Sequence, residues 1–346
     1  MRRKRLAVIG AGAIGRTHVD RARLHPDVEV VAIADPSPAA EQFANDERVE
    51  WFADYAAMLD SAEPEGVIVA TPNATHLDVG LACVERGIAA LIEKPVTDRV
   101  EDSLRLDRAA RDAGVPVLVG HHRRHNPILR RAREFVSSGR LGTAVAANAF
   151  ATFYKPDAYF DVPWRRQAGG GPVLINLIHD IDTMRFLLGE IVEVQAQTSK
   201  NVRGFEVEDT AAVLLRFESG ALGTLLVSDT AVAPWDWDLA AGEAAHFPRQ
   251  DENTHFLMGT EASLTLPRLD IWEYRSGKGW HDPLTVERST PQASDPYHEQ
   301  LRHFAAVIAR EEAPVCSAVD GARTLAATLA VHDSAAARAP VAPAQV

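Results

Sequence analysis

Residues 6–15 read LAVIGAGAIG, a short apolar run that ends in three glycines with the spacing G-x-G-x-x-G. The apolar residues predict a buried strand over 6–10, and the residues that follow predict a helix over 14–24. A second apolar run, VEVVAIAD at 28–35, ends in Asp35, 20 residues after Gly15. A strand, a glycine loop, a helix and a later acidic residue, in this order, are the fingerprint of a dinucleotide-binding βαβ unit.

Each residue of this fingerprint has a physical task. Gly10 is expected to make the tight turn, Gly12 to let the backbone approach a pyrophosphate, and Gly15 to let helix and strand pack closely. The N–H groups at the start of the helix would bind the anion. A carboxylate at Asp35 accepts hydrogen bonds from a ribose 2′-OH and repels a 2′-phosphate, so the sequence favours NAD over NADP.

The first 120 residues alternate short apolar runs with helical patterns. Further strands are predicted at 66–71, 88–93 and 115–120, and further helices at 39–45, 76–86 and 100–113. The strand runs are continuously apolar, which is typical of strands buried on both faces of a parallel sheet. The sequence therefore predicts an α/β Rossmann domain over residues 1–122.

The pattern changes after Gly120. Strands are predicted at 143–153, 191–198, 210–217, 221–229, 263–266 and 269–275, and helices at 126–138, 173–188, 296–310 and 321–337. Strands that follow one another without helical crossovers indicate a mostly antiparallel, open sheet. Residues 123–346 are thus expected to form an α+β domain. Its C-terminal helices are candidates to pack back on the first domain.

Composition excludes several classes of protein. The 346 residues suggest about two domains, and 46% hydrophobic and 24% charged residues are ordinary for a globular protein. A net charge of −12 argues against binding to nucleic acid or to anionic lipid. Two cysteines exclude a disulfide scaffold and a four-cysteine zinc site. No apolar run approaches the roughly 18 residues of a membrane span.

The first five residues, MRRKR, stand before an apolar run and so imitate a signal peptide. That apolar run, however, carries the three glycines of the fingerprint. It is better interpreted as the first strand and its loop, so a cytoplasmic protein is expected.

Four further motifs carry a family resemblance. They are TPNATH at 71–76, LIEKP at 91–95, RRHNP at 123–127 and GGGPVLINLIHDID at 169–182. Together with the glycine fingerprint, they make the chain resemble the Gfo/Idh/MocA family over nearly its whole length. Most members are NAD(P)-dependent dehydrogenases of sugars, polyols and related cyclic alcohols. The open face of their second sheet often supports oligomers, so the resemblance implies that residues 123–346 are the substrate-binding and oligomerisation domain of a homo-oligomer, a dimer or tetramer.

The resemblance also implies which residues contact the cofactor. These are Gly10, Gly12, Ala13, Ile14, Gly15, Asp35, Thr71, Pro72, Asn73, His76, Glu93 and Lys94.

Lys94 is the first candidate for the chemistry, because oxidation of a secondary alcohol needs a base for the hydroxyl proton. It stands at the carboxyl end of a predicted strand, the edge where open α/β sheets bind ligands. Partial burial and the positive nicotinamide ring would both disfavour its charged form. In the family this lysine is catalytic, and the bond to the following proline, here Pro95, is often cis.

His179 is the second candidate. Asn176, His179, Asp180 and Thr183 recur at i, i+3, i+4 and i+7, so they form one polar face on a helix that otherwise looks buried. That face is expected to border a cleft. The family places its catalytic histidine here, normally with Asp or Asn four residues earlier. This chain has Ile175 at that position, so the role is vacant or passes to Asn176 or Asp180.

Weaker candidates for substrate contact combine an aromatic ring with a cation. Trp164 and Arg165 precede the glycine run, Tyr154 and Lys155 end a strand, and Arg123 follows the last strand of the first domain. His121, His122 and His125 do not indicate a metal, because neighbouring residues on a strand point to opposite faces and no carboxylate accompanies them. No metal is expected.

The leading hypothesis is therefore an NAD-dependent dehydrogenase that acts on a secondary alcohol of a sugar, inositol or related cyclic polyol. One alternative is a reductase of an imine or keto-cyclitol. The other is a non-catalytic sensor that binds NAD or a sugar, which the replacement at Ile175 keeps open. Retention of both Lys94 and His179 argues against the sensor.

Overall fold

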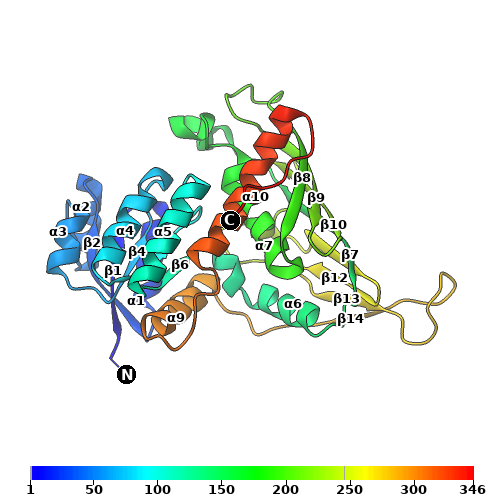
Figure 1. Cartoon of the computed structure of the whole chain (residues 1–346), viewed down its shortest axis with the longest axis horizontal. Helices are drawn as coiled ribbons and strands as arrows, with labels where there is room; N and C mark the ends of the chain where they lie inside the picture. Colours follow the sequence, from blue (N-terminus) through cyan, green and yellow to red (C-terminus); the bar gives the residue numbers. More distant parts are fainter. Residues whose placement is uncertain (1, 245) are drawn as a thin grey trace. The chain divides into compact units, whose positions relative to one another are not determined.

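The computed structural model describes residues 2–244 and 246–346. The chain forms two compact units (Figure 1). Unit 1 comprises the residues up to His125 together with Ser294–Leu325 and the terminal Val346. Unit 2 comprises Asn126–Ala293 and Ala326–Gln345. The sequence predicts that the two domains divide between residues 122 and 123, and this boundary stays a prediction.

Unit 1 is built on a six-stranded parallel sheet. Its strands are β1 (Lys4–Ile9), β2 (Val28–Ala34), β3 (Glu50–Phe52), β4 (Gly66–Val69), β5 (Ala89–Ile92) and β6 (Val117–Val119), in the order β3-β2-β1-β4-β5-β6. This order reverses between β1 and β4, and the crevice at such a reversal is where open α/β sheets bind ligands. The predicted Rossmann domain is confirmed.

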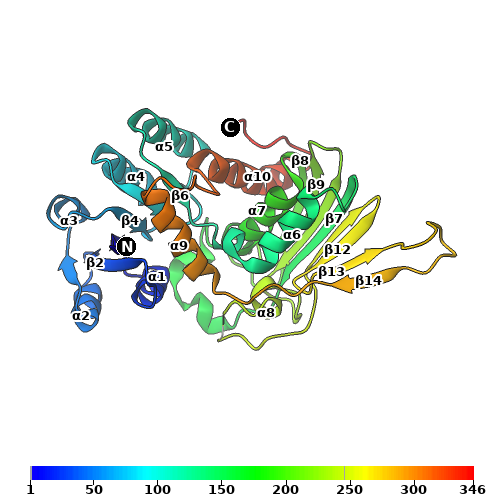
Figure 2. The same cartoon turned by 90° about the horizontal axis from the view of Figure 1, so that it is seen from below.

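Helices cover both faces of this sheet (Figures 1 and 2). They are α1 (Ala13–Arg23), α2 (Pro38–Glu47), α3 (Tyr55–Ser61), α4 (His76–Glu85), α5 (Val100–Ala113) and α9 (Pro296–Ile308), with 3-10 turns η1 (Asn73–Thr75) and η2 (His122–His125). Apolar residues of α1, α2 and α9 share one core with Leu6 and Val8 of β1. Residues of α3, α4 and α5 share a second core with Ala7 and Ile9, which point to the other face.

Unit 2 contains an eight-stranded sheet. Its strands are β7 (Ala144–Thr152), β8 (Ile191–Ser199), β9 (Thr210–Phe217), β10 (Leu222–Ser228), β11 (His255–Gly259), β12 (Ala262–Leu266), β13 (Asp270–Glu273) and β14 (Thr285–Arg288). The order is β14-β13-β12-β11-β7-β10-β9-β8, and every pair is antiparallel except β7 with β10. The predicted mostly antiparallel sheet is therefore confirmed.

The described helices of unit 2 leave one face of this sheet open (Figure 2). The elements are α6 (Pro127–Ser137), η3 (Asp157–Asp161), η4 (Pro163–Arg166), the π turn η5 (Val173–Leu177), α7 (Ile178–Leu188), α8 (Trp237–Ala240) and, from Ala326 onward, α10 (Ala318–Ala337). Residues of η5, α7 and the second half of α10 form a core with β7 to β10. Residues of α6 and α8 form another with β11 to β13.

The structure differs from the predicted elements in several places. It adds β3, β11, β14, α3 and α8, all of seven residues or fewer, because short elements carry too little periodic pattern to be read. α10 begins at Ala318 instead of 321. His122 and His125 lie in the turn η2 beyond β6, so the argument that placed these histidines on opposite faces of a strand was wrong.

Candidate functional site

The glycine loop after β1 has the geometry that its spacing predicts. Gly10 has φ +93°, and a Cβ there would come within 2.5 Å of the Ala70 carbonyl oxygen. A Cβ on Gly15 would overlap the Gly10 carbonyl oxygen. A Cβ on Gly12 would meet no atom of the described residues within 4 Å, so the space beside this backbone is open. The loop thus fits a bound pyrophosphate at the start of α1.

Asp35 follows β2 and faces this loop. Its Oδ2 accepts a 2.8 Å hydrogen bond from the Ala11 N–H, and its Oδ1 accepts a 2.9 Å bond from the Ser37 N–H. Burial raises the pKa of Asp35, but the bonds from Ala11 and Ser37 outweigh it, so the pKa lies below its ordinary value. The side chain is therefore a fixed carboxylate, as the ribose contact of an NAD site requires.

The loop after β4 is tied to the loop after β5 through His76. The ring of His76 is buried, with Nδ1 2.9 Å from the Pro95 carbonyl oxygen and Nε2 2.9 Å from the Thr71 carbonyl oxygen. Pro72 and Asn73 are exposed at the tip of the first loop. Both nitrogens of His76 therefore contact main-chain oxygens of loops that hold predicted cofactor residues.

Glu93 and Lys94 follow β5. The Lys94–Pro95 bond is cis, as the resemblance implied, and the Lys94 side chain is half-buried. The buried Glu93 lies 2.7 Å from Nε2 of His18, and its Oε2 accepts the Lys94 N–H at 3.2 Å. Burial raises the pKa of Glu93. The bond with His18 and the nearby positive charge together lower it by more, so the pKa lies below its ordinary value. No sequence signal linked His18 to this position.

Arg123 lies in η2 and is 4% exposed. This predicted substrate-binding residue is therefore buried in unit 1, in the turn that follows β6.

In unit 2, the predicted helix over 173–188 is divided. Its first turn is the π turn η5, and α7 begins only at Ile178. Asn176 and His179 are half-buried, whereas Asp180 and Thr183 are each 1% exposed. The Asp180 carboxylate lies 3.1 Å from Nε2 of His255 on β11. The expectation that the whole polar face borders a cleft was therefore wrong for Asp180 and Thr183.

Asn176 contacts a lysine instead. The Lys155 Nζ donates a 2.6 Å hydrogen bond to Asn176 Oδ1. Burial lowers the pKa of Lys155 to about 8, although nearby Asp229 and Asp236 act to raise it. Such perturbed groups are concentrated at functional sites.

The remaining aromatic and cationic candidates lie around Lys155. Tyr154 and Trp164 are each 51% exposed. The Arg165 guanidinium lies 3.9 Å from the Tyr159 ring centre, and its Nη1 donates to the Tyr159 carbonyl oxygen at 2.7 Å. The Lys155 Nζ lies 4.9 Å from the same ring. Tyr159 therefore connects Lys155 with Arg165.

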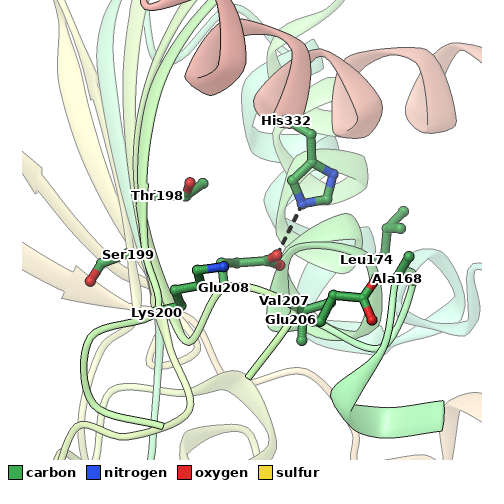
Figure 3. Close-up of a pocket in the computed structure, with 11 residues that line it drawn as sticks. Ala168, Leu174, Thr198, Ser199, Lys200, Glu206, Val207, Glu208 and His332 are labelled. Atoms are coloured by element: carbon green, nitrogen blue, oxygen red, sulfur yellow. Dashed lines mark ion pairs between the residues drawn. The ribbon is translucent and has the colours of Figure 1, made fainter. Parts of the chain in front are cut away.

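A separate pocket of about 440 Å³ lies elsewhere in unit 2 (Figure 3). Its lining residues include Leu174, Lys200, Glu208 and His332. They include none of the residues that the sequence predicts to contact the substrate. Glu208 Oε2 lies 3.2 Å from His332 Nε2, and Glu208 Oε1 accepts the Val173 N–H at 3.0 Å. Glu208 therefore links α10 to the first residue of η5.

Two family models match the chain. Residues 4–121 match the oxidoreductase family with an NAD-binding Rossmann fold, and residues 129–265 match the GFO/IDH/MocA C-terminal domain. The chain belongs to the Gfo/Idh/MocA oxidoreductase family. Unit 1 contains the NAD-binding domain of this family, so the protein is an NAD-dependent oxidoreductase.

Several known proteins are similar to this chain. Rhizopine catabolism protein MocA of Rhizobium meliloti is 30% identical over 76% of this chain and 85% of its own length. The scyllo-inositol 2-dehydrogenase (NAD(+)) of Bacillus subtilis (strain 168) is 27% identical over 95% of this chain and 93% of its own. Levoglucosan dehydrogenase, solved with NADH and levoglucosan, shares the fold with a TM-score of 0.82 at 20% identity, over 99% of this chain and 100% of that one.

No helix among the described residues is both long enough and apolar enough to cross a membrane.

Proposed function

We propose that this NAD-dependent oxidoreductase transfers hydride between the nicotinamide and a secondary alcohol of a sugar, inositol or related cyclic polyol. The observation that carries the proposal is that the chain has both a complete NAD loop in unit 1 and a half-buried histidine on α7 in unit 2. The names of relatives such as scyllo-inositol 2-dehydrogenase support the substrate class.

NAD supplies the hydride acceptor when it is bound. The residues of this chain that would hold it are the glycine loop, Asp35, Thr71, Pro72 and Asn73, together with His76, Glu93 and Lys94 near the carboxyl ends of the strands. The open space beside Gly12 and the fixed carboxylate of Asp35 fit the pyrophosphate and a ribose diol.

Lys94 is the proposed base that takes up or shares the hydroxyl proton. Its main-chain N–H is held by the buried Glu93 carboxylate, which fixes the backbone from which the side chain extends. His179 is the proposed second acid–base group of the reaction.

A substrate panel tests this function directly. The purified protein is incubated with NAD and with inositols, hexoses, sugar acids and anhydrosugars, while the absorbance of the reduced cofactor is followed. Turnover of at least one cyclic alcohol, lost in Lys94→Met and kept in the surface variant Lys278→Met, supports the proposal. Tight NAD binding with no turnover across the panel would instead favour the sensor.

We also propose that the protein is a homo-oligomer in the cytoplasm. Leu214 and Leu222 of the open sheet are 51% and 59% exposed, and Trp272 is 40% exposed, so apolar side chains of three strands remain uncovered within unit 2. Burial of such a surface would stabilise an assembly. Light scattering should give more than one chain per particle for the wild type and a smaller particle for Leu214→Glu. Cell fractionation tests the location.

A further inference from the structure

Lys155 has an unusual setting for a lysine. It follows β7, is 5% exposed, and has charged neighbours from four separate segments. Those neighbours are Asp229 after β10, Asp236 before α8, Arg203 in the loop after β8, and Arg165 in η4. Lysines are almost never this buried unless a partner holds them.

Asn176 accepts a hydrogen bond from the Lys155 ammonium. The Nζ to Oδ1 distance is 2.6 Å, which is typical of a short, charge-assisted hydrogen bond. An ammonium has donors only, so the oxygen of the amide must face Lys155. The amide nitrogen of Asn176 is therefore turned the other way, where it can only donate.

The charged neighbours of Lys155 do not replace Asn176 as its hydrogen-bond acceptor. Asp229 is bound by Arg203, whose Nε donates to its Oδ1 at 2.8 Å, so this carboxylate is shared with a second cation. The rings of Tyr159 and Phe153 lie 4.9 and 5.7 Å from Nζ and shield it from water. Asn176 is thus a neutral acceptor beside a group of two carboxylates and three cations, Lys155 included.

We propose that Lys155 is a positioning residue for the reaction: by holding the oxygen of Asn176, it fixes the amide nitrogen of Asn176 as a hydrogen-bond donor to the substrate, three residues before His179. This inference rests on the proposed function. It gives the site an amide donor where Ile175 leaves the usual side chain absent. The substrate would accordingly present an acceptor oxygen, a hydroxyl, ring or carboxylate oxygen, at this point.

The proposal makes the site sensitive to alkali. Burial is the main reason why the pKa of Lys155 is lowered to about 8. Below that pH the ammonium holds Asn176; above it the neutral amine donates more weakly and can also accept, so the amide is free to turn over. Positioning is therefore expected to weaken as the pH rises through about 8.

The first experiment measures the pair without turnover. The chain has five lysines, so protein labelled with ¹³C at lysine Cε gives few signals, and Lys155→Met assigns the one that matters. We expect its titration midpoint near pH 8. Asn176→Asp places a carboxylate at the same position, so it should raise the midpoint. A midpoint that Asn176→Asp leaves unchanged would overturn the contact.

The second experiment measures turnover of the panel alcohol that reacts fastest. Lys155→Met should lower kcat/KM about 10- to 100-fold, the range expected for loss of a hydrogen bond to a charged group, and leave the Kd of NAD unchanged. Asn176→Ala should lower kcat/KM by a similar factor. The double variant should lower kcat/KM little more than either single variant, because the two side chains act as one. Lys155→Arg, which keeps its charge at every accessible pH, should restore part of the activity and abolish the loss above pH 8.

Lys200→Met is the matched control, because Lys200 is an exposed lysine of the same unit. Thermal unfolding of each variant shows whether it has folded. Independent effects of Lys155→Met and Asn176→Ala, or an alkaline loss that persists in Lys155→Arg, would refute the positioning role. If the panel gives no turnover at all, the proposed function fails, whereas the titration still decides whether Lys155 holds Asn176.

Discussion

The strongest prediction concerns Asp35 and the choice of cofactor. Its carboxylate is held by the N–H groups of Ala11 and Ser37, and its pKa is below the ordinary value, so it stays charged throughout the working pH range. A 2′-phosphate carries a charge of about −1.5 to −2 at neutral pH. Placed at the ribose position, it would meet this fixed negative charge.

The size of the effect follows from Coulomb's law. Two unit charges about 4 Å apart repel by about 1 kcal/mol in water and about 4 kcal/mol near a protein surface. Because Asp35 is partly exposed, we take a value near the lower limit and scale it for the phosphate charge. The expected penalty is about 1.5–2 kcal/mol, or about 10- to 30-fold in kcat/KM for NAD over NADP.

Asp35→Asn tests this value. The amide removes the charge and leaves one acceptor, so kcat/KM with NAD should fall about 10-fold while that with NADP rises or stays level. The NAD preference should therefore shrink by at least about 10-fold. Asp20→Asn, an exposed carboxylate on α1, is the control. A wild-type preference for NADP, or an unchanged preference in Asp35→Asn, would refute the reasoning.

Three further predictions concern the same loops and helix. Gly12→Ala should leave the Tm of the cofactor-free protein unchanged and weaken NAD binding, whereas Gly15→Ala, which overlaps a carbonyl, should destabilise the fold by about 1–3 kcal/mol in thermal unfolding. His179→Ala should lower kcat at least about 10-fold with a near-normal Kd for NAD, and unchanged turnover would remove it from the mechanism. Because the pKa of Glu93 is lowered in the folded state, the unfolded state takes up its proton first as the pH falls. The stability advantage of the wild type over Glu93→Gln should therefore shrink between about pH 5 and pH 3 in urea titrations, and a constant difference would contradict the assignment.

The parts of the fold that could be predicted from the sequence are those with local signals. The strand, glycine turn and acidic residue at 6–35 define their own geometry, because positive φ and close packing permit only glycine at Gly10 and Gly15. The cis bond before Pro95 and the helix that carries His179 followed from the family resemblance.

The remaining features depend on contacts between residues far apart in the chain. Asp180 looked like part of a polar face, but its partner His255 stands 75 residues later and cannot be found from helical spacing. Lys155 was visible as a lysine beside an aromatic residue, yet only the fold brings it to Asn176. The π turn at Val173–Leu177 has no sequence signal, since its residues also suit an α-helix.

His76 shows how such a contact can mislead mutagenesis. Its ring joins two main-chain oxygens that belong to loops after neighbouring strands, at Thr71 and Pro95. A displacement of either loop would disturb the contact with the other, because both contacts are made by one planar ring that is fully buried. Removing the imidazole would take away both contacts, so part of the resulting loss of NAD affinity would come from displaced loops and could be mistaken for the loss of a cofactor contact alone.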